Sequence, residues 1–537
     1  MDYQVIVVGG GPVGMGLAID LGLRGISTAL VEREETLHRI PKGQNLTQRT
    51  MEHFKSWGIE EEVRAARVMP ADYPTGGVTA YGTLTGPYSY RWYRRDQVGS
   101  YYFADNERLP QYQTEAVLRE RVSRLGRVDA LFGWRAAGLE QTGSGVEVLT
   151  TSAAGDEPRT LRAEYAVGCD GSRSFVRDAS GIGEERSEHE RTMVLIVFRS
   201  RHLHELLEGF DDASFFNVLN PSLDGYWQFL GRVDVGEEWF FHAPVPVGTT
   251  LDNYDFTALL HQAVGAEFEV EYEYVGFWDL RIAIADRYRS GRVFIAGDAA
   301  HSHPPYGGYG INTGLEDSRN LGWKLAAVLD GWAPDSLLAS YDEERRRVFA
   351  STARDFIETF IADDRQFLTS HDPERDAADF EAAWEERRSG SNVGVQTFEP
   401  HYEGSPIVFG PENGITSAKG SHVLIARAGH HLPPVPLSDG RDLFTELGTG
   451  FTLISLGAGK AATRRFGEAA RSLGIPLSMI DDTYDGGREA YGSTMVLVRP
   501  DHYVAWVGGG DSVRAEEILS RVVGRSSPQS RVRSQES

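Results

Sequence analysis

The chain has 537 residues, more than one hydrophobic core usually organises, so about three or four domains are expected. It carries 54 Lys and Arg against 78 Asp and Glu, a net charge of −24. That charge does not suit a protein whose main task is to bind nucleic acid or an anionic membrane. The single cysteine, Cys169, excludes an intramolecular disulfide and an all-thiolate metal site, and no metal site is predicted.

The amino terminus lacks the basic and apolar pattern of a signal peptide, because residues 1–3 lead directly into the apolar run of residues 5–8. This run is too short to cross a bilayer and predicts a buried parallel strand. No later stretch approaches the ~18 apolar residues of a membrane helix. We therefore expect a cytoplasmic protein with no membrane or nucleic-acid partner.

Residues 1–34 predict a strand, a glycine turn, a helix and a second strand that ends at Glu32, which together make a βαβ unit. Residues 45–66 have helical spacing with Gly58 as punctuation. Further along, residues 115–123 predict a helix, and residues 164–168 and 293–296 predict strands. We expect one nucleotide-binding domain built from residues 1–185 and 281–350.

Two regions within this domain, residues 70–105 and 186–280, are aromatic and rich in turn residues, which predicts a β-sheet. We expect them to form the substrate-binding region. Candidate walls of a substrate pocket are Phe216, Trp227 and Phe241. Packing between sheet layers is the competing role for each of these aromatic side chains, and it is the more frequent one.

The last third of the chain divides into three further segments. Residues 351–404 are highly charged and helical in pattern, which predicts a connector with a solvated face. Residues 405–525 alternate between strand and helix patterns and predict a separate small α/β domain. Residues 526–537 lack apolar anchors, so a flexible tail is expected.

The first motif with chemical meaning is Gly-Gly-Gly-Pro-Val-Gly at residues 9–14, which has the GxGxxG spacing. A predicted strand precedes it, a predicted helix follows it, and Glu32 stands about 20 residues further on, as a dinucleotide site requires. Glycine lets the backbone approach a pyrophosphate, the helix start supplies free N–H groups, and the carboxylate accepts hydrogen bonds from a ribose.

A second motif follows the predicted strand of residues 293–296, which leads into Gly297 and Asp298. An aspartate at the carboxyl end of a strand can bind a ribityl hydroxyl at the cofactor crevice. The loop of residues 304–314 then places backbone amides at the start of the next helix, where they stabilise negative charge. A surface loop with a capping asparagine is the alternative.

A third motif, Asp170-Gly171, is by itself only a turn signal. In their order and spacing, however, the three motifs resemble those of the class A flavoprotein monooxygenases. Residues 48–52 (QRTME), 301–305 (HSHPP) and 320–325 (NLGWKL) are similar to the phenol and 2,4-dichlorophenol hydroxylase branch. Residues 491–506 resemble that branch's thioredoxin-like module, so the resemblance covers nearly the whole chain.

The resemblance implies an α/β fold with a Rossmann-like FAD-binding domain, an inserted β-rich substrate domain and a C-terminal thioredoxin-like domain. It implies FAD as the cofactor and NADPH or NADH as the co-substrate. Lys42 stands where many relatives have arginine, and Gln113 competes with Gln111 for one position near the flavin. The implied cofactor-binding residues are Gly9, Gly11, Pro12, Val13, Gly14, Glu32, Arg33, Lys42, Gln111, Asp170, Asp298, Pro305, Gly308, Gly310, Ile311 and Asn312.

The activity implied by the resemblance is hydroxylation of a phenolic or similarly electron-rich ring by O2, through a flavin hydroperoxide. Phenolate formation needs a base or a hydrogen-bond partner. The candidates are His303, His242, Tyr226 and Arg281, each of which can equally be structural.

Two alternatives stay open on the same scaffold. One is Baeyer–Villiger oxygenation or epoxidation of a polycyclic compound, and the other is a flavoprotein that shields an intermediate without turnover. The family also implies a homodimer. The thioredoxin-like region contains no cysteine, which excludes dithiol exchange there.

Overall fold

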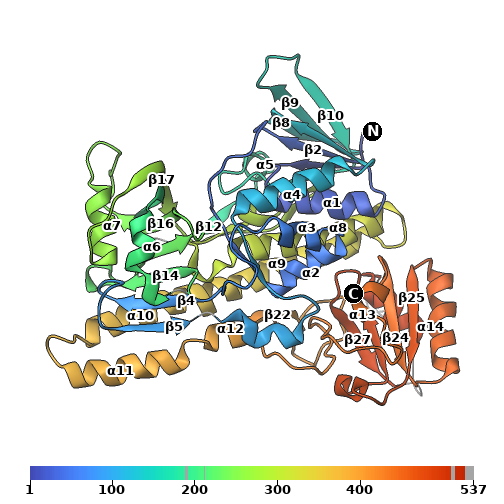
Figure 1. Ribbon diagram of the computed structural model, residues 1–537. Helices are drawn as coiled ribbons and strands as arrows, with labels where there is room; N and C mark the ends of the chain where they lie inside the picture. Colours follow the sequence, from blue (N-terminus) through green and yellow to red (C-terminus); the bar gives the residue numbers. More distant parts are fainter. Residues whose placement is uncertain (93, 188–190, 211, 510–513, 526–537) are drawn as a thin grey trace, which may run out of the picture.

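The computed structural model describes residues 1–92, 94–187, 191–210, 212–509 and 514–525. Among these residues, no helix is long and apolar enough to cross a membrane. Figure 1 shows a central α/β body, a green β-sheet on its left and an orange-red domain at the lower right. The expected flexible tail, residues 526–537, lies outside the described residues.

A six-stranded sheet forms the core of the central body. Its order is β19 (Arg289–Ser290), β20 (Val293–Ile295), β11 (Tyr165–Gly168), β1 (Val5–Val8), β2 (Thr28–Glu32) and β7 (Val128–Phe132). All but β19 run parallel, and β1, β11 and β20 are buried throughout, as continuous apolar runs predict for a covered parallel sheet. Helix α1 (Pro12–Leu23) packs against α4 (Gln111–Ser123) and α8 (Gly310–Leu329). The predicted βαβ unit is confirmed.

Two parts of this body differ from the sequence expectation. The predicted helix over residues 45–66 is broken into α2 (Gln48–Ser56) and α3 (Glu60–Ala65), because Gly58 adopts a φ of 68° between them. Strands β8 (Trp134–Gln141), β9 (Val146–Ser152) and β10 (Arg159–Ala163) form a three-stranded antiparallel sheet that the pattern did not indicate. Many of their side chains are exposed, so they lack a strong apolar signal.

The two aromatic regions combine into one seven-stranded sheet. Its order is β17 (Glu271–Leu280), β13 (Arg191–Arg199), β16 (Glu238–Val245), β15 (Trp227–Arg232), β14 (Phe215–Leu219), β4 (Gly77–Tyr81) and β5 (Ser89–Trp92). The parallel pairing of β4 with β14 joins segments about 140 residues apart in the chain. The expectation of an inserted β-rich domain is therefore confirmed.

The two faces of this sheet have different neighbours. On the outer face, Phe216, Leu230 and Phe241 share one apolar cluster with residues of α6 (Arg201–Leu206) and α7 (Phe256–Val264). On the inner face, Phe240 packs with Ile40, and Trp227 packs with Tyr306. Ile40 and Tyr306 both belong to loops of the central body, so the inner face looks toward that body.

One row of the inner face alternates glycine and phenylalanine across four strands, in the order Gly77, Phe215, Gly231 and Phe240. A Cβ atom at Gly77 would overlap the ring of Phe215, and one at Gly231 would overlap the ring of Phe240. Each ring therefore lies over a neighbouring glycine. These glycines make room for aromatic side chains on the face that looks toward the central body.

Beyond α8, a mostly helical segment leads to the last domain; it begins earlier and ends later than the connector expected over residues 351–404, and it is called the connector from here on. The connector comprises α9 (Ala339–Thr352), a π-helical turn (Ala353–Glu358), α10 (Thr359–Ser370), α11 (Ala377–Gly390), α12 (Val393–Thr397), and the paired strands β22 (Phe398–Tyr402) and β23 (Thr416–Lys419).

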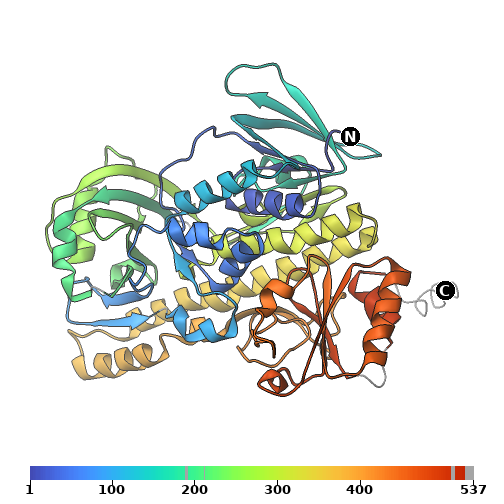
Figure 2. The ribbon, with the colours of Figure 1, turned by 45° about the vertical axis from the view of Figure 1, so that its right-hand side comes forward.

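The last domain has a four-stranded mixed sheet in the order β25 (Leu477–Asp482), β24 (Phe451–Leu456), β26 (Met495–Val498) and β27 (Val504–Gly508). Helices α14 (Lys460–Leu473) and α15 (Ala515–Val522) pack together beside this sheet, and Figure 2 shows the domain against α8. This is the thioredoxin-like arrangement that was expected.

Buried ion pairs join α8 and α9 to the last domain. The guanidinium of Arg499 donates to Glu344 Oε1 at 2.6 Å, and Lys324 Nζ donates to Glu344 Oε2 at 2.7 Å. Asn320 Nδ2 also donates to Glu344, and Trp323 Nε1 donates to Asp501. The motif of residues 320–325 thus acts here as an anchor for the last domain.

Candidate cofactor and substrate site

The first glycine motif forms a close turn against the carboxylate of Glu32. Gly10 N donates to Glu32 Oε2 at 2.5 Å, which holds the carboxylate over the turn at the end of β2. Gly9 has a φ of 107°, and a Cβ atom there would overlap the carbonyl oxygen of Cys169. Only glycine fits this position without strain.

Helix α1 begins with free backbone donors. Its N-cap is Gly11, Pro12 follows, no side chain of the described residues caps the start, and the first turn contains no acidic residue. A Cβ atom built at Gly11 would meet no described atom within 4 Å, so the space in front of the helix is open. Unpaired N–H groups beside open space fit a pyrophosphate.

Asp298 lies at the carboxyl end of β20 and is exposed to solvent. Although solvent reaches the side chain, protein atoms surround the carboxyl group, and this desolvation raises its pKa. The nearby His301, Lys42 and Arg281 act in the opposite direction. Gly297, directly before it, has a φ of 58° and packs against Val13 at the start of α1. The carboxylate therefore faces an open crevice beside the first motif, where it fits a ribityl hydroxyl.

The start of α8 can offer a ligand only its backbone N–H groups, because the Asn312 side chain is fully used in hydrogen bonds within the protein. Its Oδ1 accepts from Thr47 N at 2.8 Å and from Thr50 Oγ1 at 2.7 Å. Its Nδ2 donates to the carbonyl oxygens of Asn45 at 2.8 Å and Gly308 at 2.7 Å. Asn312 thus ties three segments together, and its side chain has no spare donor. No side chain of the described residues caps α8, which leaves its first N–H groups for an anionic ligand.

The loop after β2 meets the starts of α4 and α8 at one point. A Cβ atom at Gly43 would lie 3.3 Å from Gln111 Oε1 and 3.7 Å from Ile311 Cγ2. Lys42, the residue before Gly43, is close enough to both Glu115 and Asp298 for its positive charge to lower the pKa of each carboxyl group. Gln111 is therefore the glutamine at this meeting point.

Two predicted cofactor residues make side-chain contacts with neighbouring protein groups. Asp170 Oδ1 accepts from Ser174 Oγ at 2.5 Å, and Oδ2 accepts from Val176 N at 3.1 Å, which fastens the start of α5 (Phe175–Ala179). The Asp-Gly motif thus supports the first glycine turn, while the Asp170 carboxylate is used internally. The Arg33 side chain is 72% exposed and pairs with Glu34.

The inner face of the sheet carries polar groups that sequence reasoning did not combine. His242 is paired with Phe229, which is paired with Asn217, so these three side chains share one face. Neither ring nitrogen of His242 nor Oδ1 of Asn217 has a hydrogen-bond partner among the residues that the structure describes. Burial lowers the pKa of His242 from 6.5 to about 4, so the imidazole is neutral at pH 7. Only the strand register, which the sequence does not reveal, brings these groups together.

The expected substrate walls divide between the two faces. Trp227 lies on the inner face, where its ring centroid is 4.2 Å from that of Tyr306. Phe216 and Phe241 instead point to the outer face and pack in the cluster with α6 and α7. These two side chains therefore belong to a core and do not line the space toward the central body.

The other candidate catalytic side chains are spread over the site. His303 Nδ1 lies 2.5 Å from the carbonyl oxygen of Pro304, and burial lowers the pKa of His303 to about 4. Arg281 Nη2 donates to the carbonyl oxygen of Ser172 at 3.0 Å and acts on Asp298, so it lies on the cofactor side. The Tyr226 ring lies beneath the guanidinium of Arg365, on the side of α10.

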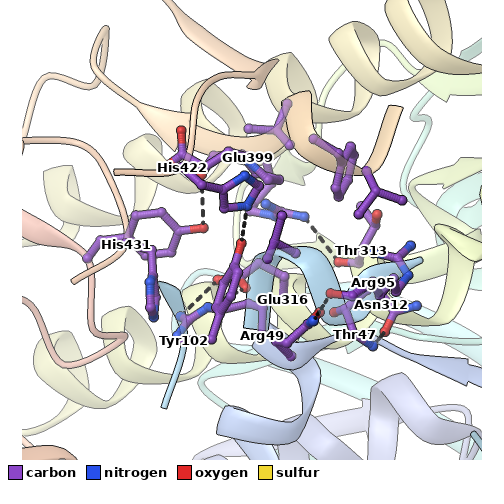
Figure 3. A pocket seen from close by; sticks show the side chains of 18 residues that line it. Thr47, Arg49, Arg95, Tyr102, Asn312, Thr313, Glu316, Glu399, His422 and His431 are labelled. Carbon is purple, nitrogen blue, oxygen red and sulfur yellow. Dashed lines mark hydrogen bonds and ion pairs between the residues drawn. The ribbon is translucent and has the colours of Figure 1, made fainter. Parts of the chain in front are cut away.

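A pocket at the junction of α2, α8, β22 and the last domain is shown in Figure 3. Its polar groups pair with one another: Arg49 Nε donates to Glu316 at 3.0 Å, and the Tyr102 hydroxyl lies 3.0 Å from His422 Nε2. The cavity volume is about 50 Å³, which suits a few water molecules and falls below the usual size of ligand pockets. We therefore regard this pocket as a junction between domains and not as the ligand site.

The glycine turn, the exposed Asp298 and the open helix starts define a dinucleotide-binding flavoprotein with an adjoining aromatic sheet face. A family described as FAD binding domain matches residues 2–355, and a family described as aromatic-ring hydroxylase, C-terminal, matches residues 426–526. The chain belongs to the FAD-dependent aromatic-ring hydroxylases, which are class A flavoprotein monooxygenases.

Relatives agree with this assignment over nearly the whole chain. The 4-methyl-5-nitrocatechol 5-monooxygenase of a Burkholderia species is 32% identical and covers 94% of this chain and 94% of its own. A putative polyketide hydroxylase of Streptomyces halstedii is 33% identical, with 96% and 94% covered. The solved structure of the rebeccamycin biosynthetic enzyme RebC with reduced flavin is 28% identical, has a TM-score of 0.83, and is matched over 98% of this chain and 99% of that one. The chain is a flavin-dependent monooxygenase that hydroxylates aromatic substrates and uses FAD.

Proposed function

We propose that the enzyme hydroxylates a phenolic ring held on the inner face of the seven-stranded sheet, using O2 and NADPH or NADH. The observation that carries this proposal is that both ring nitrogens of His242 and Oδ1 of Asn217 lack a hydrogen-bond partner among the described residues, although both side chains lie among aromatic residues on that face. Buried polar groups are normally hydrogen-bonded, so two such groups on one face suggest an absent ligand. The face looks toward the loops that would surround a flavin.

The residues of the central body fit FAD. When bound, FAD would supply the redox chemistry that couples NAD(P)H oxidation to ring hydroxylation, with one oxygen atom of O2 entering the ring and the other leaving as water. The carboxylate of Glu32 would hold the ribose, Asp298 would hold the ribityl chain, and the uncapped start of α8 would stabilise negative charge at the pyrimidine end. We assign to this site Gly9, Gly11, Pro12, Val13, Gly14, Glu32, Lys42, Gln111, Asp298, Pro305, Gly308, Gly310, Ile311 and the backbone of Asn312.

His242 would act on the substrate hydroxyl. A neutral imidazole accepts a hydrogen bond from a phenol, which draws the proton away from the oxygen and makes the ring more nucleophilic. The ring centroids of Phe240 and Trp278 lie 5.7 and 6.0 Å from that of His242, and Phe229 is its neighbour across the strands. These aromatic side chains would exclude water from the reacting ring.

The function is tested with pairs of phenols and their methyl ethers. Substrate-stimulated NAD(P)H oxidation is measured together with product mass, so that hydroxylation is separated from uncoupled oxidation. We expect product that has gained one oxygen atom from a phenol and at least tenfold less from its methyl ether. Equal turnover of both members of every pair would overturn the phenolic proposal.

The assignment of Asp298 is tested by Asp298→Ala. Loss of a hydrogen bond from a charged group costs about 1.5–3 kcal/mol, so FAD affinity should fall roughly 10- to 100-fold. FAD content after purification and FAD titration of the apoprotein provide the measurement. Asp286→Ala, which removes another exposed aspartate nearby in the sequence, is the matched control. Full retention of FAD by Asp298→Ala would remove Asp298 from the site.

A further inference from the structure

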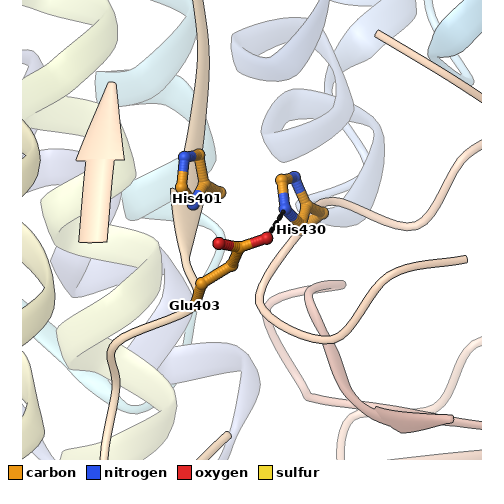
Figure 4. A group of neighbouring side chains, drawn as sticks. All are labelled: His401, Glu403 and His430. Atoms are coloured by element: carbon orange, nitrogen blue, oxygen red, sulfur yellow. Dashed lines mark hydrogen bonds and ion pairs between the residues drawn. The ribbon is translucent and has the colours of Figure 1, made fainter. Parts of the chain in front are cut away.

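Two histidines and a glutamate meet where the connector joins the last domain. His401 lies in β22, Glu403 follows that strand, and His430 belongs to a segment that precedes β24. One ring nitrogen of each histidine and one Glu403 oxygen all lie within 4.8 Å of one another. Figure 4 shows the Glu403 carboxylate directed between the two imidazole rings. This group lies outside the cofactor and substrate site.

His430 is oriented by a second carboxylate. The residue is 3% exposed, and its Nδ1 lies 2.8 and 2.9 Å from the two oxygens of Glu399. Its Nε2 lies 2.9 Å from Glu403 Oε1. A histidine whose Nδ1–H is held by a carboxylate is a usual arrangement around a bound metal ion. The His401 and His430 rings stack with their centroids 4.6 Å apart, so one ring must turn for both to bind the same ion in their ring planes.

His401 supplies the independent observation. It is 5% exposed, its Nε2 lies 3.3 Å from the carbonyl oxygen of Lys419, and its Nδ1 has no hydrogen-bond partner in the described ranges. With the proton on Nε2, Nδ1 carries a free lone pair in a buried ring. Such a nitrogen normally finds a partner, and hydrogen bonds within the cluster do not provide one.

We propose that His401, Glu403 and His430 bind a divalent transition-metal ion of the zinc type. Two imidazoles and one carboxylate are a ligand set that Zn²⁺ accepts, whereas Mg²⁺ and Ca²⁺ prefer oxygen ligands throughout. The Glu403 side chain is 24% exposed, which leaves a path from solvent to the cluster.

The ion would fasten the connector to the last domain. His401 and Glu403 belong to the connector, while Gly429 N donates to the carbonyl oxygen of Val504 and Val504 N donates to that of His430. The His430 segment is thereby fixed to β27. A metal bridge here would crosslink two parts of a chain whose single cysteine cannot form an internal disulfide. The sequence pattern misses the site because Glu403 and His430 are 27 residues apart.

The experiment uses the FAD-loaded protein, stripped of metal by a chelator and titrated with Zn²⁺ by calorimetry. We expect one Zn²⁺ per chain and a higher midpoint of thermal unfolding in its presence. Co²⁺ serves as a second probe, because its visible absorption reports nitrogen and oxygen ligation. His401→Phe keeps an aromatic ring in place and should weaken Zn²⁺ binding at least tenfold. His371→Phe is the matched control, since His371 pairs with Asp379 outside this cluster.

FAD absorbance and far-ultraviolet circular dichroism verify that each variant is folded. If His401→Phe does not fold, Glu403→Gln decides, because Glu403 is partly exposed and the substitution preserves its shape. Loss of Zn²⁺ binding in Glu403→Gln supports the site. Absence of stoichiometric Zn²⁺ binding in the native chain would overturn the proposal. Undiminished binding in folded His401→Phe and Glu403→Gln would do the same.

Discussion

The two faces of the seven-stranded sheet are both buried and both aromatic, yet they differ in whether the sheet's own polar side chains have hydrogen-bond partners. On the outer face, Phe216 and Phe241 are covered by α6 and α7. On the inner face, His242 and Asn217 retain polar atoms without partners in the described part of the chain. On the outer side, a buried ring nitrogen without a partner in the described ranges, His204 Nε2, belongs to the covering helix α6. On the inner side, such atoms belong to the sheet strands themselves and face the central body, where unmet hydrogen bonds fit a ligand.

Hydrophobicity does not separate these faces. Residues 239–242 of β16 read Trp-Phe-Phe-His, and all four are buried. A strand with one wet face alternates apolar and polar residues, but this strand is covered on both sides. The polar atoms therefore distinguish the faces better than the aromatic rings do.

The largest effect should come from the outer face. Phe241→Ala leaves a cavity in a filled core and should lower the free energy of unfolding by about 3–5 kcal/mol. Denaturant unfolding measures this loss, and the KM for the aromatic substrate should stay within about twofold at low temperature. Phe277→Ala, at a side chain that is 38% exposed, is the control and should have a much smaller effect on stability. A large change in KM without a stability loss would place Phe241 in the substrate site.

The inner face should produce a pH-dependent stability. The pKa of His242 is about 4 in the folded protein and 6.5 ordinarily, so the unfolded chain binds the proton first as the pH falls. Protonation of His242 therefore leaves the free energy of unfolding unchanged above pH 6.5. Between pH 6.5 and 4 it lowers that free energy by up to about 3 kcal/mol. The stability of the His242→Phe variant should decline less over this pH range, which thermal unfolding at several pH values can measure. Parallel curves for the two proteins would contradict the buried neutral imidazole.

His242→Phe should also separate function from stability. Loss of one hydrogen bond to the substrate should raise the KM for a phenol about tenfold, or lower the coupling of NAD(P)H oxidation to hydroxylation by a similar factor. At pH 7 the stability should be unchanged or higher, because the substitution removes two unpartnered buried nitrogens. Steady-state kinetics with product analysis tests this expectation. A destabilised variant with native kinetics would make His242 structural.

The smallest effect is expected at Asn217. Asn217→Leu preserves the volume of the side chain and removes one unpartnered acceptor, so the KM for a phenol should rise roughly two- to fivefold. Asn220→Ala, in the turn after β14, is the control and should leave the KM unchanged, although Asn220 caps that turn. An effect at Asn220 equal to that at Asn217 would point to a general disturbance of the sheet.

The sequence alone determined the central body and its dinucleotide site, and the family resemblance implied that the dinucleotide is FAD. A GxGxxG turn with Glu32 after it, and Asp298 at a strand end, act through local backbone geometry, so spacing along the chain is sufficient to predict them. The alternating strand and helix pattern likewise predicted a separate small α/β domain at the end of the chain, and the family resemblance implied that it is thioredoxin-like. Gly58 marks a break in the helical pattern, but the sheet of β8 to β10 was not visible, because its largely exposed side chains give no strong apolar signal.

Only the tertiary structure decided which residues share a face or a cluster. The direction of Phe241 relative to His242 follows from strand register and from the helices that cover one side of the sheet. The Asp170 carboxylate, expected at the cofactor, is taken by Ser174 and the backbone of Val176. His401 and His430 come together because the connector folds against the last domain. Such long-range contacts depend on packing between elements, and no local pattern encodes them.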